Sequence, residues 1–404
     1  MLTKTLTASP RGTVKIPPSK SLSHRAAICM SLAGGNPAEI DNIGRSADVT
    51  ATLSGLLTIA RSDGRGGTID CGESGSTMRF LIPVAAMHGG EWIFTGRGRL
   101  LERPLDVYEK VFHDAEVDFI RHRDRIIING PLTAGRYELA GDVSSQFITG
   151  LLLALPLTGG DCDIVLTSPL ESASYVSLTL DVMRAFGVAA EETNGADGRP
   201  AGWIIPGGQG YLKRPYHIEG DWSQAAFFLC AGALGADVAV SGLDQDSIQG
   251  DKRVTDILEL MGATLTAKDG IFMARPGAGG LKGIKIDTRD IPDIVPPLAA
   301  LACFAEGETL FTGAGRLRLK ESDRLAALVK ELSILGADIK ETPDGLCIHG
   351  RQKLPGGSVS ANNDHRIAMA LAVASLGCEQ PVQLDGAESV DKSYPEFWAD
   401  WEKS

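Results

Sequence analysis

The chain has 404 residues, of which 43% are hydrophobic and 6% are aromatic. This length and composition predict a soluble globular protein of two or three domains with a sizeable core. The formal net charge of -12 argues against a nucleic-acid-binding protein that relies on general basicity, but it leaves room for a local cationic pocket.

Seven cysteines are scattered along the chain without a C-x-x-C pair. Cys29, Cys230 and Cys303 lie within apolar helical stretches, so we expect buried free thiols and a reducing compartment. The N-terminus has no long apolar segment, and no later segment of membrane-spanning length lacks charged or turn residues. We therefore expect a cytoplasmic protein.

The first predicted helix begins in residues 20–25, after two prolines that disfavour helix before them. Ser19 or Ser21 can cap it, and the pair Gly34 and Gly35 should end it. Lys20 and Arg25 would then lie near free backbone N–H groups that favour an anion. The alternative is an ordinary capped helix with two solvated cations, and this segment alone does not decide between them.

Six segments share one pattern, in which a polar start is followed by a small-residue apolar helix, a glycine turn and a β-rich stretch. They begin near Ser19, Ser74, Ser144, Asp221, Asp293 and Asp364. These helices are apolar nearly all round, so we expect them to be buried. Amphipathic helices at residues 176–186, 254–261 and 323–335 each end at a glycine, and the fixed order indicates a duplicated supersecondary unit.

Six such units predict an α/β protein of two similar lobes with three units each. We place the N-terminal lobe at residues 18–216 and the C-terminal lobe at residues 1–17 plus 217–404, so that the first strand completes the C-terminal half. A cleft between the lobes, lined by the polar helix starts, is the expected ligand site.

Several arginines stand in the first turn of a predicted buried helix. Arg25, Arg79 and Arg366 oppose the helix dipole there, which is costly unless an anion is bound nearby. Loops add further cations at Arg103, Lys320, Arg324 and Lys392. We interpret the charged run at residues 121–125 as a solvated hairpin tip.

Two carboxylates are candidates for proton transfer. Asp293 begins a buried helix and can equally be a simple N-cap, whereas Glu321 lies among cations that favour its ionised form. The chain has no G-x-x-x-x-G-K-[ST], H-E-x-x-H or G-x-S-x-G motif. Its seven histidines lack metal-ligand spacing, so we expect no metal site.

Taken together, these motifs resemble the EPSP synthases, the 3-phosphoshikimate 1-carboxyvinyltransferases of the enolpyruvyl transferase family. The matching stretches are residues 19–25, 75–79, 102–104, 144–147, 291–293, 320–324, 363–366 and 392–395. They follow the family order over nearly the whole chain. The resemblance implies two lobes of three βαβαββ units, an inside-out α/β barrel.

The implied reaction belongs to the shikimate pathway of aromatic amino acid biosynthesis. It joins the enolpyruvyl group of phosphoenolpyruvate to the 5-hydroxyl of shikimate 3-phosphate through a tetrahedral intermediate and releases phosphate. The resemblance implies no cofactor and no metal, with small-molecule partners only and no nucleic acid or membrane. We expect a monomer, and glyphosate competes for the phosphoenolpyruvate place in much of the family.

The resemblance also assigns roles to individual residues. Asp293, Glu321 and Lys20 are the expected catalytic groups: Asp293 as the base for the 5-hydroxyl and Glu321 as the acid for the methylene carbon. The expected shikimate 3-phosphate ligands are Lys20, Ser21, Arg25, Ser144, Ser145, Gln146, Ser172, Tyr175, Asp293 and Lys320. The expected phosphoenolpyruvate ligands are Lys20, Gly75, Arg103, Gln146, Arg324, Arg366 and Lys392.

Three positions depart from the family pattern. Glu73 stands where asparagine is common, Trp222 where a small residue is usual, and Arg316 where some members have a substrate-contacting asparagine. These departures leave the roles of Glu73 and Arg316, and the sensitivity to inhibitors, open.

Two other functions compete with this interpretation. The sister transferase that acts on UDP-N-acetylglucosamine usually has Lys-Asn at the first motif and a reactive cysteine before the arginine at position 103. Here Ser21 follows Lys20, and residues 96–102 contain no cysteine. A non-catalytic anion-binding protein would need no paired acids, whereas Asp293 and Glu321 are both present.

Overall fold

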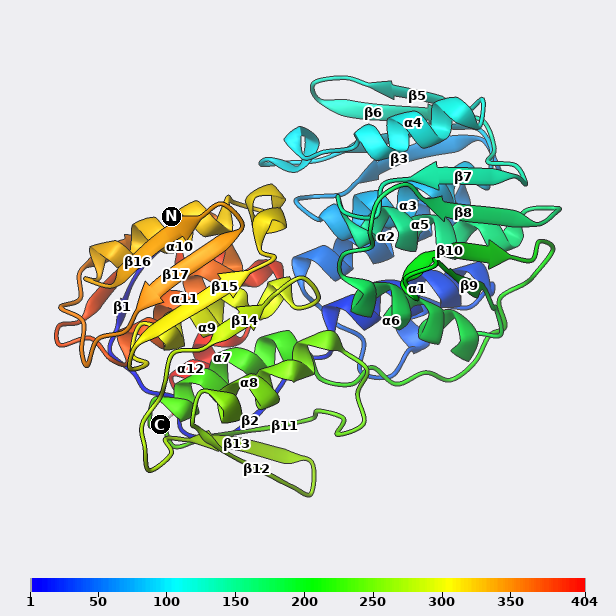
Figure 1. Cartoon of the computed structure of the whole chain (residues 1–404). Helices are drawn as coiled ribbons and strands as arrows, with labels where there is room; N and C mark the ends of the chain where they lie inside the picture. Colours follow the sequence, from blue (N-terminus) through cyan, green and yellow to red (C-terminus); the bar gives the residue numbers. More distant parts are fainter. Residues whose placement is uncertain (1, 404) are drawn as a thin grey trace. The chain divides into compact units, whose positions relative to one another are not determined.

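The computed structural model describes residues 2–403, which form two compact units (Figure 1). One unit is Lys20–Ile218, and the other consists of the described residues of Met1–Ser19 and Glu219–Ser404. Each unit contains its own continuous hydrophobic core. We call them the central unit and the terminal unit, and we describe each by itself.

The central unit alternates helices with short strands. Its main elements are α1 (Lys20–Leu32), α2 (Ala47–Arg61), β3 (Gly66–Asp70), α3 (Gly75–Ala86), β4 (Glu91–Thr95), η2 (Leu100–Glu102), α4 (Asp106–Asp114), β5 (Asp118–Arg121), β6 (Arg125–Asn129), β7 (Arg136–Leu139), α5 (Ser145–Ala154), β8 (Cys162–Leu166), α6 (Ala173–Ala185), β9 (Glu191–Asn194) and β10 (Pro200–Ile205).

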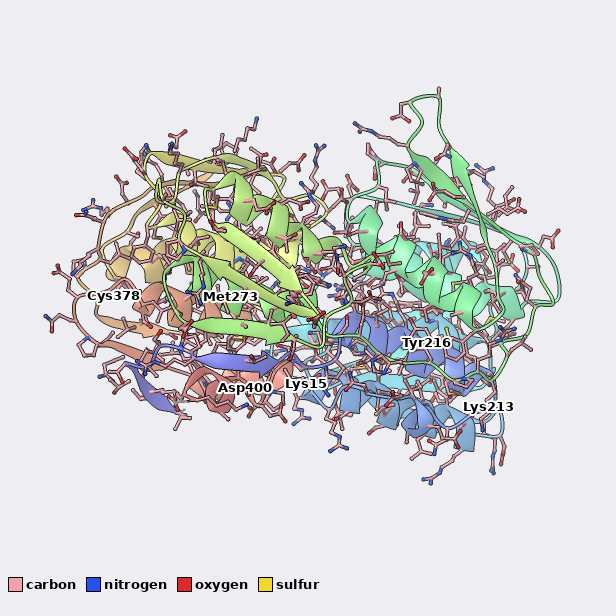
Figure 2. The ribbon with its side chains drawn as sticks, turned by 90° about the horizontal axis from the view of Figure 1, so that it is seen from below. Lys15, Lys213, Tyr216, Met273, Cys378 and Asp400 are labelled. Atoms are coloured by element: carbon pink, nitrogen blue, oxygen red, sulfur yellow. The ribbon has the colours of Figure 1, made fainter. Side chains whose placement is uncertain are left out.

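The two sheets of the central unit have the same topology. Their strand orders are β3-β4-β6-β5 and β7-β8-β10-β9, and in each only the first pair is parallel. The buried helices α3 and α5 pack against each other, and α1 packs against α5. Near the end of this unit, the ring of Tyr216 packs on that of Phe186 with centroids 5.5 Å apart (Tyr216 is labelled in Figure 2).

The terminal unit repeats the same alternation. Its elements are β1 (Thr3–Leu6), β2 (Gly12–Lys15), α7 (Trp222–Ala233), β11 (Val238–Ser241), η4 (Gly250–Arg253), α8 (Val254–Leu260), β12 (Thr264–Lys268), β13 (Ile271–Arg275), β14 (Lys285–Asp287), η5 (Pro292–Ile294), α9 (Val295–Ala302), β15 (Glu308–Thr312), η6 (Gly315–Leu319), α10 (Arg324–Ile334), β16 (Asp338–Thr342), β17 (Gly345–His349), β18 (Ser358–Ser360), α11 (His365–Ser375), β19 (Val382–Asp385), η7 (Ala387–Lys392) and α12 (Phe397–Trp401).

Two sheets of the terminal unit share the topology of the central unit. They run β2-β11-β13-β12 and β14-β15-β17-β16, whereas the third sheet has the order β18-β19-β1. Strand β1 pairs antiparallel with β19 and β2 pairs parallel with β11, so the start of the chain completes this unit. The buried helices α7, α9 and α11 pack on one another, and the sheet of β14 to β17 covers them on the outside (Figure 1).

The predicted α/β fold is confirmed, and the repeat has a clear structural form. Four of the six predicted repeats, those of α3, α5, α7 and α9, are βαβαββ units with one strand order. The repeat of α11 is completed by β1. In the described residues the repeat of α1 and α2 has no sheet of its own, and an isolated bridge joins Asp41 to His217 there.

The six predicted buried helices are α1, α3, α5, α7, α9 and α11, and each begins within two residues of its predicted start. Side chains of Ser74, Ser144, Asp221 and Asp364 cap four of them, as the polar starts predict. The amphipathic helices α6, α8 and α10 end before Gly187, Gly262 and Gly336. These glycines have φ of 84°, 96° and 98°, a left-handed conformation that a side chain would disfavour.

All seven cysteines are free thiols, and every one except the half-buried Cys378 (labelled in Figure 2) is buried, which confirms the expectation for Cys29, Cys230 and Cys303. Across residues 2–403, none of the helices combines the length and the apolar character needed to cross a bilayer. The tip at residues 121–125 joins β5 to β6 as predicted and is mostly exposed.

Candidate active site

In the central unit, the start of α1 is tied to those of α2 and α3. The Lys20 ammonium lies 2.8 Å from Oδ2 of Asp48, in the first turn of α2. The backbone carbonyl of Asp48 accepts a hydrogen bond from the Thr77 hydroxyl at 3.1 Å, in the first turn of α3. Lys20 is therefore held at a junction of three helix N-termini, which together favour an anion.

Arg25 lies inside the central unit rather than at its surface. Its Nε donates to Thr179 Oγ1 at 2.8 Å, Nη1 donates to the Ser21 carbonyl at 2.8 Å, and Nη2 donates to the Tyr175 carbonyl at 3.0 Å. Burial lowers the pKa of Arg25 to about 10. The sequence suggested a cation open to ligand, whereas the observed contacts show that Arg25 also ties α1 to α6.

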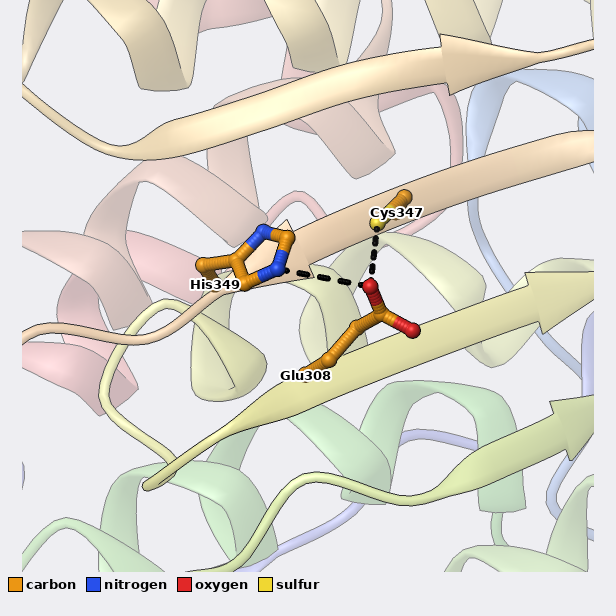
Figure 3. Close-up of side chains that lie close together, drawn as sticks. All are labelled: Glu308, Cys347 and His349. Carbon is orange, nitrogen blue, oxygen red and sulfur yellow. Dashed lines mark hydrogen bonds and ion pairs between the residues drawn. The ribbon is translucent and has the colours of Figure 1, made fainter.

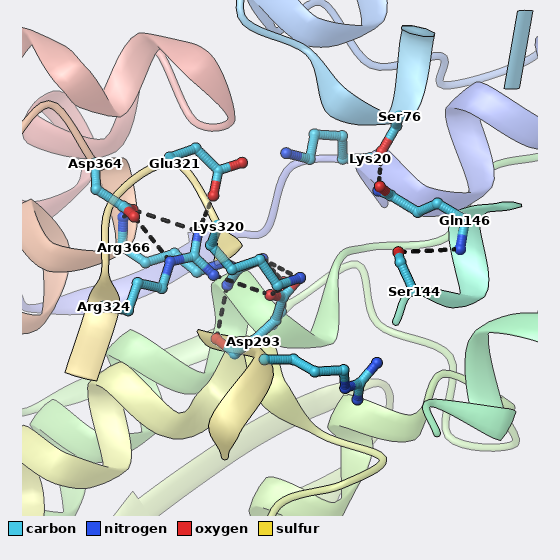
Figure 4. Close-up of polar contacts among 12 residues, drawn as sticks. Lys20, Ser76, Ser144, Gln146, Asp293, Lys320, Glu321, Arg324, Asp364 and Arg366 are labelled. Carbon is cyan, nitrogen blue, oxygen red and sulfur yellow. Dashed lines mark hydrogen bonds and ion pairs between the residues drawn. The ribbon is translucent and has the colours of Figure 1, made fainter. Parts of the chain in front are cut away.

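Gln146 is oriented by side chains from α3. Its Oε1 accepts from Arg79 Nη1 at 2.7 Å, and its Nε2 donates to Ser76 Oγ at 2.9 Å. The Ser144 hydroxyl caps α5 by accepting from the Gln146 backbone N–H at 3.3 Å (Figure 4). Arg79 thus positions a predicted substrate ligand, a role that its place in a first helical turn did not reveal.

Gly75 leaves room for the guanidinium of Arg103. A Cβ at position 75 would lie 2.6 Å from Arg103 Nη1, which is closer than real Cβ contacts allow. The backbone before Arg103 is held in turn by Arg121, whose Nη2 donates to the Leu101 carbonyl at 2.8 Å and to the Arg103 carbonyl at 3.3 Å. Arg121 is therefore more than a solvated charge on the hairpin.

The remaining predicted ligands of this unit lie at helix starts. Ser21 is in the first turn of α1, Ser145 is the buried first residue of α5, and Tyr175 is in the first turn of α6. Ser172 precedes α6 with a left-handed φ of 56° and a buried side chain. Such a backbone conformation is unusual for serine and is associated with functional sites.

In the terminal unit, three cations converge on Asp293 in η5, the turn that leads into α9. Its Oδ1 lies 3.2 Å from Arg324 Nη1 and 3.6 Å from Lys320 Nζ, and its Oδ2 accepts from Arg366 Nη2 at 2.9 Å (Figure 4). Arg366 Nη1 also donates to the Asp293 backbone carbonyl at 2.9 Å. Asp293 is therefore the centre of an ion cluster rather than a simple N-cap.

Arg324 joins Asp293 to two further carboxylates. Its Nη2 lies 2.7 Å from Glu321 Oε2, and its Nε donates to Asp364 Oδ2 at 2.8 Å. The side chain of Arg324 is only 2% exposed. Burial lowers its pKa, but the charges of Asp364, Glu321 and Asp293 outweigh burial and raise that pKa overall, so the guanidinium stays charged.

For Lys320, the effect of burial on the pKa outweighs that of the neighbouring carboxylates. Burial is the largest effect and lowers the pKa of Lys320 to about 8, although Asp293 raises it in part. The charge on Arg324 lowers it further. A lysine whose pKa is lowered by burial and by a neighbouring charge is a frequent feature of functional sites.

The structure brings Asp293, Lys320, Glu321, Arg324 and Arg366 into one network. Lys392 lies at the end of η7 and donates to the Asn363 carbonyl at 2.7 Å. It therefore reaches the residue next to Asp364.

The three departures from the family pattern have distinct environments. Trp222 is fully buried, with its ring against Phe272 at a centroid distance of 4.9 Å, so it belongs to the core. Arg316 donates to the Arg289 carbonyl at 2.8 Å. A Cβ at Gly98 would lie 2.9 Å from Glu73 Oε2, so this carboxylate rests on the backbone of the loop that leads to η2.

Several residues hold the predicted ligands although sequence reasoning gave them no such role. Asp48, Arg79, Ser223 and Asp364 bind Lys20, Gln146, Arg366 and Arg324, respectively. Each lies in or next to the first turn of a helix in a polar stretch. Their position at helix starts could have marked these residues as candidates, but it does not reveal which residue each one binds.

Known proteins with similar sequences share one description. A sequence profile described as "EPSP synthase (3-phosphoshikimate 1-carboxyvinyltransferase)" matches residues 6–401. The 3-phosphoshikimate 1-carboxyvinyltransferase of Clostridium kluyveri is 44% identical over 408 residues, which cover 96% of this chain and 94% of that protein. The corresponding protein of Clostridium novyi is 44% identical over 97% of this chain and 94% of its own length.

Solved structures show the same fold. The EPSP synthase of Acinetobacter baumannii superimposes with a TM-score of 0.75 at 25% identity, over 98% of this chain and 97% of that one. The enolpyruvyl transferase NikO of Streptomyces tendae gives a TM-score of 0.75 at 18% identity, over 99% of this chain and 96% of that one, and shows the fold alone.

The repeated βαβαββ units and the charged helix starts thus define an α/β protein with the enolpyruvyl transferase fold. With a profile match across nearly its whole length and relatives at 44% identity, the chain belongs to the EPSP synthase family.

Proposed function

We propose that the protein transfers the enolpyruvyl group of phosphoenolpyruvate to the 5-hydroxyl of shikimate 3-phosphate and releases phosphate. The observation that carries the proposal is the network around Asp293, in which two carboxylates, Asp293 and Glu321, share Arg324. This arrangement offers a base and an acid beside fixed positive charge, which addition and elimination between two anions require. The names of the relatives support this choice of substrates.

The proposed chemistry starts at Asp293. Its carboxylate takes the proton of the 5-hydroxyl as that oxygen forms a bond to C2 of phosphoenolpyruvate. Glu321 supplies a proton to the methylene carbon, with Lys20 as a further catalytic group, which gives a tetrahedral adduct. Phosphate then leaves from C2 and takes the proton from Asp293, while a proton of the methyl group returns to Glu321, and the enol ether remains.

In this proposal the cations that pair with the two acids also bind phosphoenolpyruvate. Arg324 and Arg366 are already paired with Asp293, and Arg324 also with Glu321. We infer that the carboxylate of phosphoenolpyruvate replaces part of these internal contacts, with Lys392, Gly75 and Arg103 completing its ligands. The exchange would free the two acids for proton transfer, because a carboxylate paired with a guanidinium is a weak base.

Shikimate 3-phosphate would be held by the remaining predicted ligands. The helix N-termini near Lys20, Ser144 and Ser145 suit a phosphate, and the fixed amide of Gln146 suits a ring hydroxyl. Ser21, Arg25, Ser172, Tyr175 and Lys320 complete this proposed set. Residues of both units therefore act on one pair of substrates in this proposal.

We further infer that the protein acts as a cytoplasmic monomer. All the proposed ligands come from one chain, and seven free cysteines suit a reducing compartment. Sedimentation at working concentration tests the monomer, and fractionation of the source cells tests the compartment.

The deciding experiment measures phosphate release from phosphoenolpyruvate in the presence of each acceptor. We expect release with shikimate 3-phosphate and none with UDP-N-acetylglucosamine. Release only with the sugar nucleotide would show that the protein has the activity of the sister transferase instead. Tight binding of both anions without any release would instead indicate a non-catalytic anion-binding protein.

A further inference from the structure

Three side chains that can bind metal ions meet on one sheet of the terminal unit. Glu308 is the first residue of β15, and Cys347 and His349 lie on the neighbouring strand β17 (Figure 3). Oε2 of Glu308 lies 3.3 Å from Cys347 Sγ and 3.3 Å from His349 Nε2. One ligand atom from each residue lies within 4.8 Å of the other two.

The strand register places these side chains on the face of the sheet that points away from the core. Glu308 pairs directly with His349, and Cys347 lies two residues before His349, hence on the same face. Their neighbours Thr309 and Ile348 are fully buried on the opposite face. The side chains of Glu308 and His349 are 53% and 44% exposed, so an ion can reach them from solvent.

Two of the three distances between the ligand atoms already fit a tetrahedral ion. Zinc binds carboxylate oxygen, imidazole nitrogen and thiolate sulfur at about 2.0–2.3 Å, which separates its ligand atoms by about 3.3–3.8 Å. Both contacts of Glu308 Oε2 are 3.3 Å, which is the required separation, and the third pair of ligand atoms, from Cys347 and His349, lies within 4.8 Å. The combination of sulfur, nitrogen and oxygen ligands suits Zn²⁺ better than Mg²⁺ or Ca²⁺.

The groups around the three residues are mixed in charge. Asp338 on β16 pairs with His349 in register and adds a carboxylate, whereas Lys340 pairs with Cys347 and adds a cation. Nδ1 of His349 is buried and has no hydrogen-bond partner, so Nε2 is the nitrogen that faces the cluster. Zinc-bound histidines usually donate their second N–H to a hydrogen-bond acceptor. Because Nδ1 of His349 has no such partner, we expect only moderate affinity for the metal ion.

We propose that Glu308, Cys347 and His349 form a binding site for a divalent transition-metal ion, with Zn²⁺ as the preferred ion and water as the fourth ligand. Binding forms the bond from sulfur to metal and releases the thiol proton of Cys347 to solvent. The expectation of no metal site rested on histidine spacing along the chain, and it missed Glu308, which lies 39 residues before Cys347.

The site is separate from the residues proposed for catalysis. Glu308 is at the start of β15, whereas the chain reaches Lys320 only after the other end of this strand, Thr312, about 13 Å further along. We therefore expect the metal to affect the stability of this sheet rather than the proposed reaction, so the two proposals are tested independently.

Titration of the metal-free full-length protein with Co²⁺ under reducing conditions tests the site. Co²⁺ reports thiolate ligands by a charge-transfer band in the near ultraviolet and tetrahedral geometry by strong visible bands. We expect one equivalent to bind with both signals, and Zn²⁺ to displace it. Cys347→Ser should abolish the charge-transfer band, and His349→Gln and Glu308→Gln should each weaken binding about 10- to 100-fold or more.

The matched control is Cys378→Ser, because Cys378 is the half-buried cysteine of the same unit. We expect this variant to bind Co²⁺ like the unmodified protein, and circular dichroism shows whether each variant is folded. Absence of the charge-transfer band in the unmodified protein would overturn the proposal. A band that survives Cys347→Ser but is lost in Cys378→Ser would also overturn it.

Discussion

Asp293 and Arg366 are joined twice, although 73 residues separate them. Nη2 of Arg366 donates to the Asp293 carboxylate at 2.9 Å, and Nη1 donates to the Asp293 backbone carbonyl at 2.9 Å. The arginine therefore fixes both the side chain and the main chain of the proposed base. Removal of the Asp293 charge should affect the chemistry without dismantling the site.

Asp293→Asn keeps the size and the hydrogen-bonding oxygen of the side chain but removes the base. We expect kcat to fall on the order of 100- to 10,000-fold, whereas the affinity for shikimate 3-phosphate measured by calorimetry stays within about threefold. The exposed Asp256→Asn on α8 is the control and should leave both quantities unchanged. An Asp293→Asn enzyme with full turnover would exclude Asp293 as the base.

Lys320 should give the reaction a pH dependence near pH 8. Its pKa is lowered to about 8, chiefly by burial, so the ammonium is charged below that pH and loses its charge above it. We therefore expect the KM for shikimate 3-phosphate to rise as the pH increases through about 8.

Lys320→Arg provides the control for this pH profile, since a guanidinium stays charged throughout the range. The rise in KM should move above pH 9 or disappear in this variant, whatever its absolute KM. If the rise stays at the same pH in Lys320→Arg, another group causes it.

Gly75→Ala should weaken phosphoenolpyruvate binding selectively. The new Cβ would lie 2.6 Å from Arg103 Nη1, so the guanidinium must move away from its present position. We expect the KM for phosphoenolpyruvate to rise about tenfold or more, since loss of one charge-assisted hydrogen bond costs about 1.5–3 kcal/mol.

Gly159→Ala is the matched control for Gly75→Ala, because a Cβ at Gly159 meets no atom within 4 Å. Its KM values for both substrates should match those of the unmodified protein. An equal rise in KM for shikimate 3-phosphate in Gly75→Ala would show that the effect is general rather than specific to Arg103.

Asp364→Asn should destabilise the terminal unit. Asn preserves the helix cap of α11, but the fully buried charge that faces Arg324 is lost. Removing one partner of a buried ion pair lowers the free energy of unfolding by about 3–5 kcal/mol. We expect the low end of this range because Glu321 and Asp293 still pair with Arg324. Urea denaturation followed by tryptophan fluorescence measures the change.

Asp269→Asn serves as the control for Asp364→Asn, because Asp269 is exposed at a hairpin tip and its φ of 53° suits asparagine. This variant should unfold at the same urea concentration as the unmodified protein. Unchanged stability in Asp364→Asn would mean that the Arg324 network contributes little to folding.

Local sequence patterns were enough to predict the helices and turns of the fold and the family. Capping residues such as Ser144 and Asp364, apolar helices and the glycines that end the amphipathic helices follow rules that act within a few residues. The order of the motifs, from Lys20 to Lys392, identified the family because it spans nearly the whole chain. These features depend on the spacing of residues along the chain, which can be read directly from the sequence.

Which charged groups pair with one another depends on the tertiary structure. Asp293 with Arg366, Gln146 with Arg79, and Glu308 with Cys347 are 73, 67 and 39 residues apart, respectively. Such pairs depend on strand register and on the packing of buried helices, which position side chains from distant parts of the chain. The sequence therefore predicted cations at helix starts, but not that carboxylates of the same unit already bind them.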